Sequence, residues 1–219
     1  QWRTFMMWRN GEAFGTTDPY FGRDHGFFIF DLPWWHFVVD FAMSMTIVAL
    51  MATVLVNYLF GGIRLSARPG ERISGAAQVQ ISVVLALFAL AKAVDYWLDR
   101  FDLVLDSTNG FTGMGHTEDS TVLPGKEILA GIAIVCAVIF LANIWRRTWM
   151  LPSLGISLFV LSTVILSMIV PGVVQQFQVN PNIPDKQGPY IKENIEATRA
   201  AYDLDDIEVT SYNSDPDMD

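Results

Sequence analysis

The chain has 219 residues and a formal net charge of −9; 52% of its residues are hydrophobic and only 17% are charged. A soluble domain averages about 25% charged residues, so this composition excludes an ordinary soluble domain, a disordered chain, a collagen and a disulfide scaffold. The acidic balance also argues against nucleic-acid binding, which normally requires a basic surface.

Residues 1–33 form a polar segment with an apolar end. Its first eight residues are amphipathic and predict a short helix, and the turn signals Asn10-Gly11 and Asp18-Pro19 follow. The apolar residues 27–30 then lead into a membrane-length run. We therefore expect an interfacial segment in front of the first membrane helix.

Four apolar runs follow, at about residues 34–60, 76–98, 126–145 and 151–174. Each has about 20 residues or more, the length at which an α-helix crosses ~30 Å of hydrocarbon. In lipid the backbone must satisfy its own hydrogen bonds, so these runs are expected to be helical. Aromatic residues typical of an interfacial belt stand at the ends of the runs: Trp34, Trp35, Tyr58, Tyr96, Trp97, Trp145 and Trp149. The sequence predicts a four-helix transmembrane domain over residues 34–174.

Proline and glycine mark the boundaries of these runs. Pro33 precedes the first run, and Gly61-Gly62 closes it. In the fourth run, Pro171-Gly172 is expected to end or kink the helix.

The loops predict an orientation. Loops 61–75 and 146–150 are rich in arginine, whereas loop 99–123 and the tail are acidic. Basic residues in short loops mark the cytoplasmic side. We therefore predict a multi-pass cell-membrane protein with Arg68 and Arg146 in the cytoplasm, and with Thr112, Ser211 and both termini outside. An outside N-terminus without a signal peptide, together with Gln1 as first residue, suggests a fragment or a processed or split subunit.

The acidic tail, 175–219, begins with a proline-punctuated linker. Residues 189–203 predict an amphipathic helix with Ile191, Ile195, Thr198 and Tyr202 on one stripe, and the alternation at 207–212 predicts a strand. One helix and one strand cannot bury a core of their own. The stripe should therefore be buried against something other than the four-helix part alone. The predicted fold is an all-α integral membrane protein with a short α/β extracytoplasmic tail, the first part of a domain completed elsewhere.

Charged residues inside the runs are the most informative polar positions. Five of them fall on the outer side and form a candidate intramembrane polar cluster: Asp40, Lys92, Asp95, Lys126 and Glu127. A charge at the bilayer centre costs ~2.5–3.5 kcal/mol, and pairing Asp40 or Asp95 with Lys92 offsets much of that. A structural ion pair, a polar site facing an external cavity and snorkelling to the headgroups all fit this pattern.

Motifs for catalysis or cofactor binding are absent from the sequence. His25, His36 and His116 occur without an HxxxH, HExxH or CxxC spacing, so we predict no metal site. There is no GxSxG, P-loop or GxGxxG, and the glycine-rich stretch 110–115 is expected to be a flexible loop. Asn57 and Asn143 are expected to form interhelical hydrogen bonds or caps. Small residues of the third run, Gly131, Ala133 and Ala137, would permit close helix packing.

Several motifs together resemble a known family. They are TDPYFGRDHGFFIFDLP, NYLFGGIRL, YWLDRFDL, LPGKEIL, ANIWRRTWMLP, FQVNPN and PYIKENIEATRAAYDLDDIEV. The sequence is similar to the uncharacterised protein family 0182, an integral membrane family of actinobacteria and other bacteria. The resemblance implies a seven-helix membrane part followed by a large extracytoplasmic domain, of which this chain matches the last four helices and the start of the domain. The family has no established activity, so the resemblance assigns no functional residue.

Three functions are compatible with these features. The first is a non-enzymatic membrane module that anchors an extracytoplasmic domain or joins a larger cell-envelope complex. Its partners would be the lipid bilayer and other subunits, or a remainder of the same polypeptide, with no cofactor and no nucleic acid. The alternative is a transporter or channel component that uses Asp40, Lys92 and Asp95. An intramembrane enzyme is the least favoured, and we predict no catalytic residue.

Overall fold

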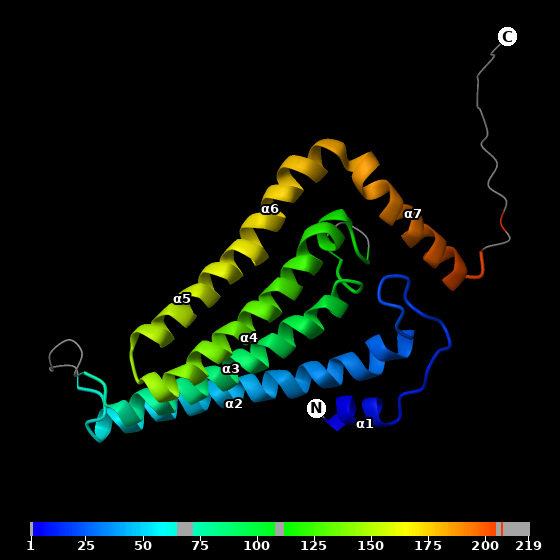
Figure 1. Ribbon diagram of the computed structural model, residues 1–219. Helices are drawn as coiled ribbons and strands as arrows, with labels where there is room; N and C mark the ends of the chain where they lie inside the picture. The colour runs from blue at the N-terminus through cyan, green and yellow to red at the C-terminus, as the bar shows by residue number, and fades with distance from the viewer. Residues whose placement is uncertain (1, 65–71, 108–111, 205–206, 208–219) are drawn as a thin grey trace, which may run out of the picture.

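The computed structural model describes residues 2–64, 72–107, 112–204 and 207. Its α-helices are α1 (Trp2–Arg9), α2 (Leu32–Leu59), α3 (Gly75–Asp102), α4 (Leu123–Arg146), α5 (Met150–Val164), α6 (Val170–Val174) and α7 (Ile183–Ala201). Helices α2 to α5 run up and down beside one another, and α7 folds back from the end of α6 (Figure 1). Over the described ranges the chain is all-helical, apart from two isolated β-bridges.

Four continuous helical stretches are long and apolar enough to cross a membrane: Phe27–Leu59, Gly75–Asp102, Glu118–Arg146 and Met150–Ala201. The prediction of four helices that are long and apolar enough to span a membrane is therefore confirmed. Each stretch extends beyond its predicted apolar run, because the helical hydrogen bonds continue into the polar flanks. The fourth extends furthest and reaches 201.

A π-helical turn precedes each of four prolines. The turns are Phe27–Asp31, Glu118–Val122, Ile165–Ile169 and Gln175–Val179; one residue follows each, and then Pro33, Pro124, Pro171 or Pro181. That intervening residue donates its N–H to the carbonyl five residues back, as Leu32 does to Phe27. A proline ring clashes with the carbonyl four residues before it, and the wider π-turn gives that ring room. Pro171 therefore does not end the fourth helix, which bends only after α6 (Figure 1).

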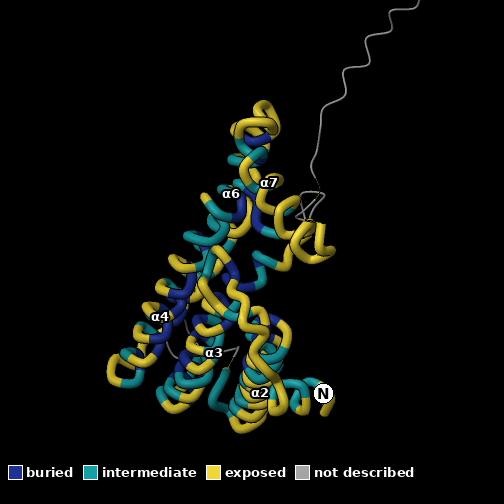
Figure 2. Tube along the Cα trace, turned by 90° about the vertical axis from the view of Figure 1, so that its right-hand side faces the viewer, coloured by how far each residue is buried: buried dark blue, intermediate teal, exposed yellow. Residues whose placement is uncertain are grey.

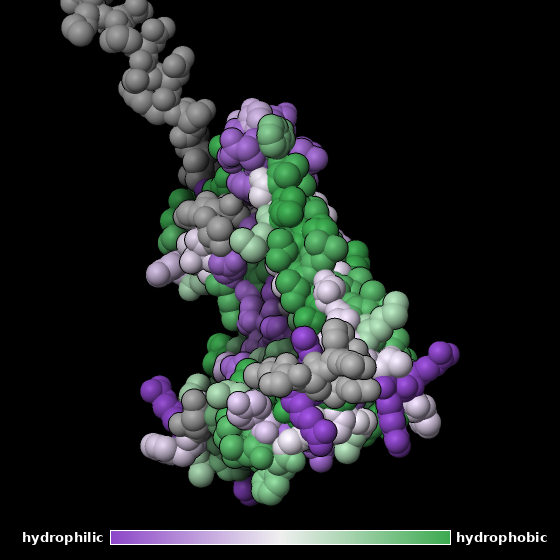
Figure 3. Space-filling model, turned by 90° about the vertical axis from the view of Figure 1, so that its left-hand side faces the viewer, coloured by the Kyte–Doolittle hydropathy of each residue, from purple (hydrophilic) through white to green (hydrophobic). Residues whose placement is uncertain are grey.

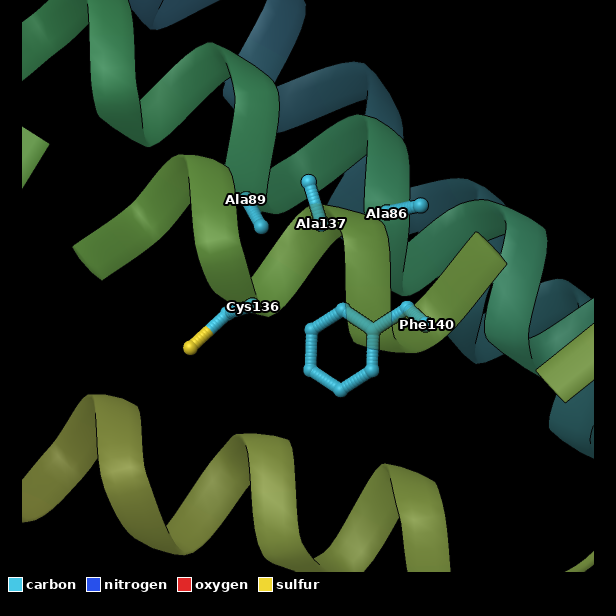
Figure 4. Packing of buried hydrophobic residues seen from close by; sticks show 5 residues of the cluster. All are labelled: Ala86, Ala89, Cys136, Ala137 and Phe140. Atoms are coloured by element: carbon cyan, nitrogen blue, oxygen red, sulfur yellow. The ribbon is translucent and has the colours of Figure 1, made fainter. Parts of the chain in front are cut away.

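The core lies between α3 and α4, with α5 closing one side. Ala86 and Ala89 of α3 meet Ala137 and Phe140 of α4, and Cys136 of α4 lies with them (Figure 4). Small side chains let helix backbones approach closely, as membrane helices require. Ala133 and Ala137 are buried as predicted, but Gly131 is exposed on α4 and has no atom near its Cβ position. The expectation that Gly131 serves packing within this bundle is wrong.

Helices α2 and α5 are peripheral. In the most apolar 18-residue part of these two spans, only 6% of the residues are buried, whereas 39% are buried in the corresponding parts of the α3 and α4 spans. Figure 2 shows the same contrast, with α2 largely exposed and α3 and α4 buried along their contact. Apolar side chains line the flank of the bundle and hydrophilic ones gather toward its ends (Figure 3). Such apolar flanks are what a membrane protein presents to lipid or to other membrane helices.

The tail departs from its prediction. The expected linker is helical, since a 3-10 turn over Asn180–Asn182 leads directly into α7, which begins at Ile183 rather than at 189. Pro184 is tolerated because it stands in the first turn of α7, where its missing N–H has no partner to lose. Residues 208–212 of the expected strand lie outside the described residues, and Ile207 is in no strand. The α/β character of the tail is therefore not supported, and its described part is helical.

Candidate functional site

Charged side chains gather at one end of the bundle, where α2 begins, α3 ends and α4 begins. We call this group the charged layer. It comprises His36, Lys92, Asp95, Asp99, Arg100, Asp102, Lys126 and Glu127. The opposite end of the bundle carries Arg64, Arg146 and Arg147.

Helix α3 supplies the centre of the charged layer. Lys92, Asp95, Asp99 and Asp102 are spaced by three or four residues, so they follow one face of the helix. Lys92 Nζ forms an ion pair with the carboxylate of Asp95, whose side chain is only 9% exposed. The same ammonium lies 4.7 Å from the centre of the Tyr96 ring. The predicted pairing of Lys92 with Asp95 is present, and it is local to one helix.

Two further ion pairs connect α3 to α4. Lys126 Nζ lies 2.8 Å from Asp99 Oδ2, and the buried Arg100 guanidinium pairs with Glu127. Arg100 also stacks over Trp97, with its Cζ 3.5 Å from the ring centre. Cation–π contact and a carboxylate together satisfy a buried guanidinium. Lys126 and Glu127 therefore connect α4 to α3 through interhelical ion pairs.

Helix α2 reaches the charged layer through His36, whose Nε2 lies 2.9 Å from Asp102 Oδ2. One ligand atom each from His36, Asp95 and Asp99 lies within 4.8 Å of the others. Imidazole and carboxylate groups are metal ligands. However, Asp95 and Asp99 already pair with Lys92 and Lys126, so a divalent cation would have to displace both ammonium groups. The chemistry that this arrangement supports best is ion pairing.

Asp40 does not join the charged layer. It is exposed on α2, and among the described residues no hydrogen bond or ion pair reaches its carboxylate. The alternative pairing of Asp40 with Lys92 is therefore absent. Sequence reasoning missed Asp99, Asp102 and Arg100 as members of the layer, although the 95-99-102 spacing was a usable signal.

A second polar contact joins α7 to the loops at the same end of the bundle. Tyr20 Oη donates to Glu193 Oε2 over 2.6 Å, and Tyr190 Oη donates to Asp119 Oδ2 over 2.8 Å. The buried Gln187 accepts a hydrogen bond from the His116 N–H through its Oε1, at 3.3 Å. These three contacts define the α7 docking surface. They connect α7 to the N-terminal segment and to the helical turns directly before α4.

The surroundings of Tyr20 keep its hydroxyl group protonated, so that it remains a hydrogen-bond donor to Glu193. Burial raises the pKa of Tyr20 above its ordinary value, and the hydrogen bond to Glu193 and the charge of that carboxylate raise it further. A phenol beside a carboxylate resists ionisation because two negative charges would then face each other. The contact is therefore intact at neutral pH.

The predicted apolar stripe of α7 is not buried within this chain. Ile191 is 38% exposed, Ile195 47% and Tyr202 74%. The helix docks through its polar side instead, and the stripe faces away from the described part of the chain. This agrees with the expectation that the four-helix part alone does not cover the stripe.

Asn57 and Asn143 are confirmed as interhelical donors. Asn57 Nδ2 donates to Gln80 Oε1 over 2.8 Å, which joins α2 to α3. Asn143 is fully buried, and its Nδ2 donates to Ser82 Oγ over 2.8 Å, which joins α4 to α3. Its Oδ1 accepts from the Thr148 N–H and so caps the end of α4.

Comparison with known proteins finds related sequences over the whole chain. A family model described as "Uncharacterised protein family (UPF0182)" matches residues 1–219. A UPF0182 protein of Nocardioides sp. is 56% identical over 213 residues, which cover 97% of this chain and 21% of the relative. The corresponding protein of Frankia alni is 47% identical and is matched over 100% of this chain and 21% of its own length. That of Streptomyces coelicolor is 43% identical, over 97% of this chain and 22% of its own.

The chain therefore spans about a fifth of the length of these curated relatives. No solved structure matches it. With four membrane-length helices and a family match over its whole length, this chain belongs to the uncharacterised protein family UPF0182.

Proposed function

We propose that this chain is a non-enzymatic membrane module of the cell envelope, which holds an extracytoplasmic part of a larger protein or complex against the outer end of its helix bundle. The observation that carries this proposal is the α7 docking surface. Helix α7 continues the fourth span and turns back onto two other segments of the chain. A helix that only left the membrane would need no such contacts.

The chemistry of the docking surface fits this role. A helix of α7's length is marginal in water unless tertiary contacts support it. Tyr20 and Asp119 belong to two different segments, and Gln187 contacts the second of them through His116, so docking fixes the direction in which the chain leaves the membrane. The exposed stripe of Ile191, Ile195 and Tyr202 then offers the next part of the assembly an apolar surface.

The proposed orientation follows from charge. Arg64, Arg146 and Arg147 lie at the end of the bundle opposite the charged layer, in line with a cytoplasmic location. The charged layer, α7 and both termini are then extracytoplasmic.

The charged layer gives less support to a transporter or channel component. His36, Asp95 and Asp99 do converge. However, the carboxylates of Asp95 and Asp99 form ion pairs with Lys92 and Lys126. A transport site needs groups that can release their partners and bind a substrate instead. The ion pairs instead suit helices that are held in a fixed register.

Limited proteolysis tests the proposal in membranes that expose the extracytoplasmic side. Trypsin cleaves at Lys186, Lys192 and Arg199 of α7 only when the helix is released from its contacts. The double variant Tyr20→Phe/Tyr190→Phe removes two hydroxyl donors and should raise the cleavage rate about thirtyfold, as the loss of two hydrogen bonds of about 1 kcal/mol each predicts. Tyr202→Phe is the matched control, because Tyr202 is 74% exposed. Equal cleavage of wild type and the double variant would reject the docking role.

A further inference from the structure

We propose that one flank of α2, comprising Asp40, Ser44, Ile47 and Met51, binds a transmembrane helix that carries a lysine or arginine opposite Asp40. The partner helix comes from outside the described residues. The inference does not rest on the α7 docking surface and is tested separately from it. We call these four residues the Asp40 flank.

The Asp40 flank is a continuous exposed stripe. At 100° per residue its four members fall within about 60° of one another around the helix axis. All four are exposed, whereas Val39 and Met43, on the neighbouring side that faces α3, are buried or half-buried. Asp40 and Ser44 stand one turn apart, so the stripe has a polar spot toward the charged end of an otherwise apolar surface.

The position of Asp40 along α2 makes solvation by headgroups difficult. It lies eight residues after Leu32, about 12 Å along the helix, and one turn deeper than His36. An aspartate has a short side chain and cannot snorkel as lysine and arginine do. Intramembrane carboxylates therefore pair with a cation or face a polar cavity. Among the described residues, no side chain supplies that partner.

A second copy of this chain does not meet the requirement. The cations of α3 and α4 near this depth, Lys92, Arg100 and Lys126, are each engaged by a carboxylate of their own copy. The Asp40 flank itself contains no basic residue, so two copies meeting through it would bring two carboxylates together. Charge complementarity therefore points to a different helix, one with an unpaired basic residue at the level of Asp40.

Site-specific photocrosslinking in the full-length protein, in its native membrane, tests the inference. A photoreactive amino acid replaces Ser44 on the Asp40 flank or, as the control, Ala49, which is exposed on the other flank of α2. We expect an adduct from position 44 that maps to a transmembrane segment with lysine or arginine within one turn of the crosslinked residue. The control position should give at most a small fraction of that adduct.

Substitution of Asp40 supplies the second measurement. Asp40→Leu should lower the yield of the adduct about tenfold or more, because it leaves the partner cation unpaired, and Asp40→Glu should retain most of it. The leucine variant stays inserted, since the change makes the span more apolar. Exchanging charges, with Asp40→Lys and an aspartate in place of the identified basic residue, should restore the adduct. Crosslinks only to lipid, to α2 of a second copy or to a segment without a basic residue would overturn the inference.

Discussion

Lys126 Nζ lies 2.8 Å from Asp99 Oδ2, so the first turn of α4 is tied to the last turn of α3. The next residue on each helix repeats the connection with the charges reversed, since Arg100 pairs with Glu127. Neighbouring pairs of opposite polarity fix both the rotation and the axial register of the two helices. A shift of either helix by one residue would oppose like charges.

The pair Lys92–Asp95 should show strong coupling. Loss of one partner leaves a half-buried charge, so Lys92→Met or Asp95→Asn should each cost ~1–3 kcal/mol, while the double variant should cost less than the sum. Unfolding in mixed detergent–lipid micelles measures these differences. Lys192→Met, which removes an exposed pair with Glu196, is the control and should cost ~0.5 kcal/mol or less. Additive losses in the double variant would show that Lys92 and Asp95 do not interact.

Gly155 should not tolerate a side chain. A Cβ at this position of α5 would lie 2.5 Å from Cε1 of Phe140, and the Phe140 ring is buried in the core. Gly155→Ala should therefore destabilise the bundle by ~1–3 kcal/mol through overpacking.

Gly131→Ala is the matched control, since nothing lies near that position within the described chain. It should be neutral or stabilise α4 by ~0.5–1 kcal/mol. Thermal unfolding of the two variants measures these changes in stability. If the loss in Gly155→Ala comes from the clash with the Phe140 ring and not from a change in helix propensity, the double variant Gly155→Ala/Phe140→Leu should recover part of it. A Gly155→Ala variant as stable as wild type would contradict the packing described here.

The turn around Asp24 should open in acid. Hydrogen bonds from the backbone N–H groups of Phe14 and Gly26, with a further one from Gly15, lower the pKa of the Asp24 carboxyl. A lowered folded-state pKa means that the stabilisation is present above the ordinary carboxyl pKa and is lost as the pH falls through the folded value. Protection of the Phe14 and Gly15 amides from hydrogen exchange should follow this course.

Asp24→Asn should lower that protection at neutral pH as well, because a neutral amide is a weaker acceptor. Glu12→Gln changes a nearby exposed carboxylate and should have no such effect. Protection in Asp24→Asn that equals wild type at pH 7 would show that the turn does not depend on the carboxylate.

Orientation is open to a direct test. Single cysteines in place of Arg64, Arg146 and Thr112, on a Cys136→Ala background, should react with an impermeant thiol reagent on intact cells only at position 112. Arg68 and Ser211 lie outside the described residues but extend the same test. Labelling at 64 or 146 without labelling at 112 would reverse the proposed orientation.

The sequence by itself determined which segments form helices long and apolar enough to cross a membrane. Runs of about 20 apolar residues leave the backbone only the helix as a way to satisfy its hydrogen bonds in lipid. The pairing of Lys92 with Asp95 was also accessible, because a spacing of three residues places both on one face of a helix. Asn57 and Asn143 were predictable as interhelical donors for a similar reason, since an amide in an apolar run needs a partner.

Tertiary structure alone decided which helices meet and which charges pair between them. A membrane helix is apolar on all sides, so its sequence carries little information about its rotation. For this reason Asp40 was one of the two predicted partners of Lys92, whereas the rotation of α2 points His36 toward Asp102 and leaves Asp40 exposed. Likewise, the prolines of the tail indicated a linker. Helix α7 forms there with Pro184 in its first turn and Pro189 inside it, and Tyr20 and Asp119 hold the helix from two other segments.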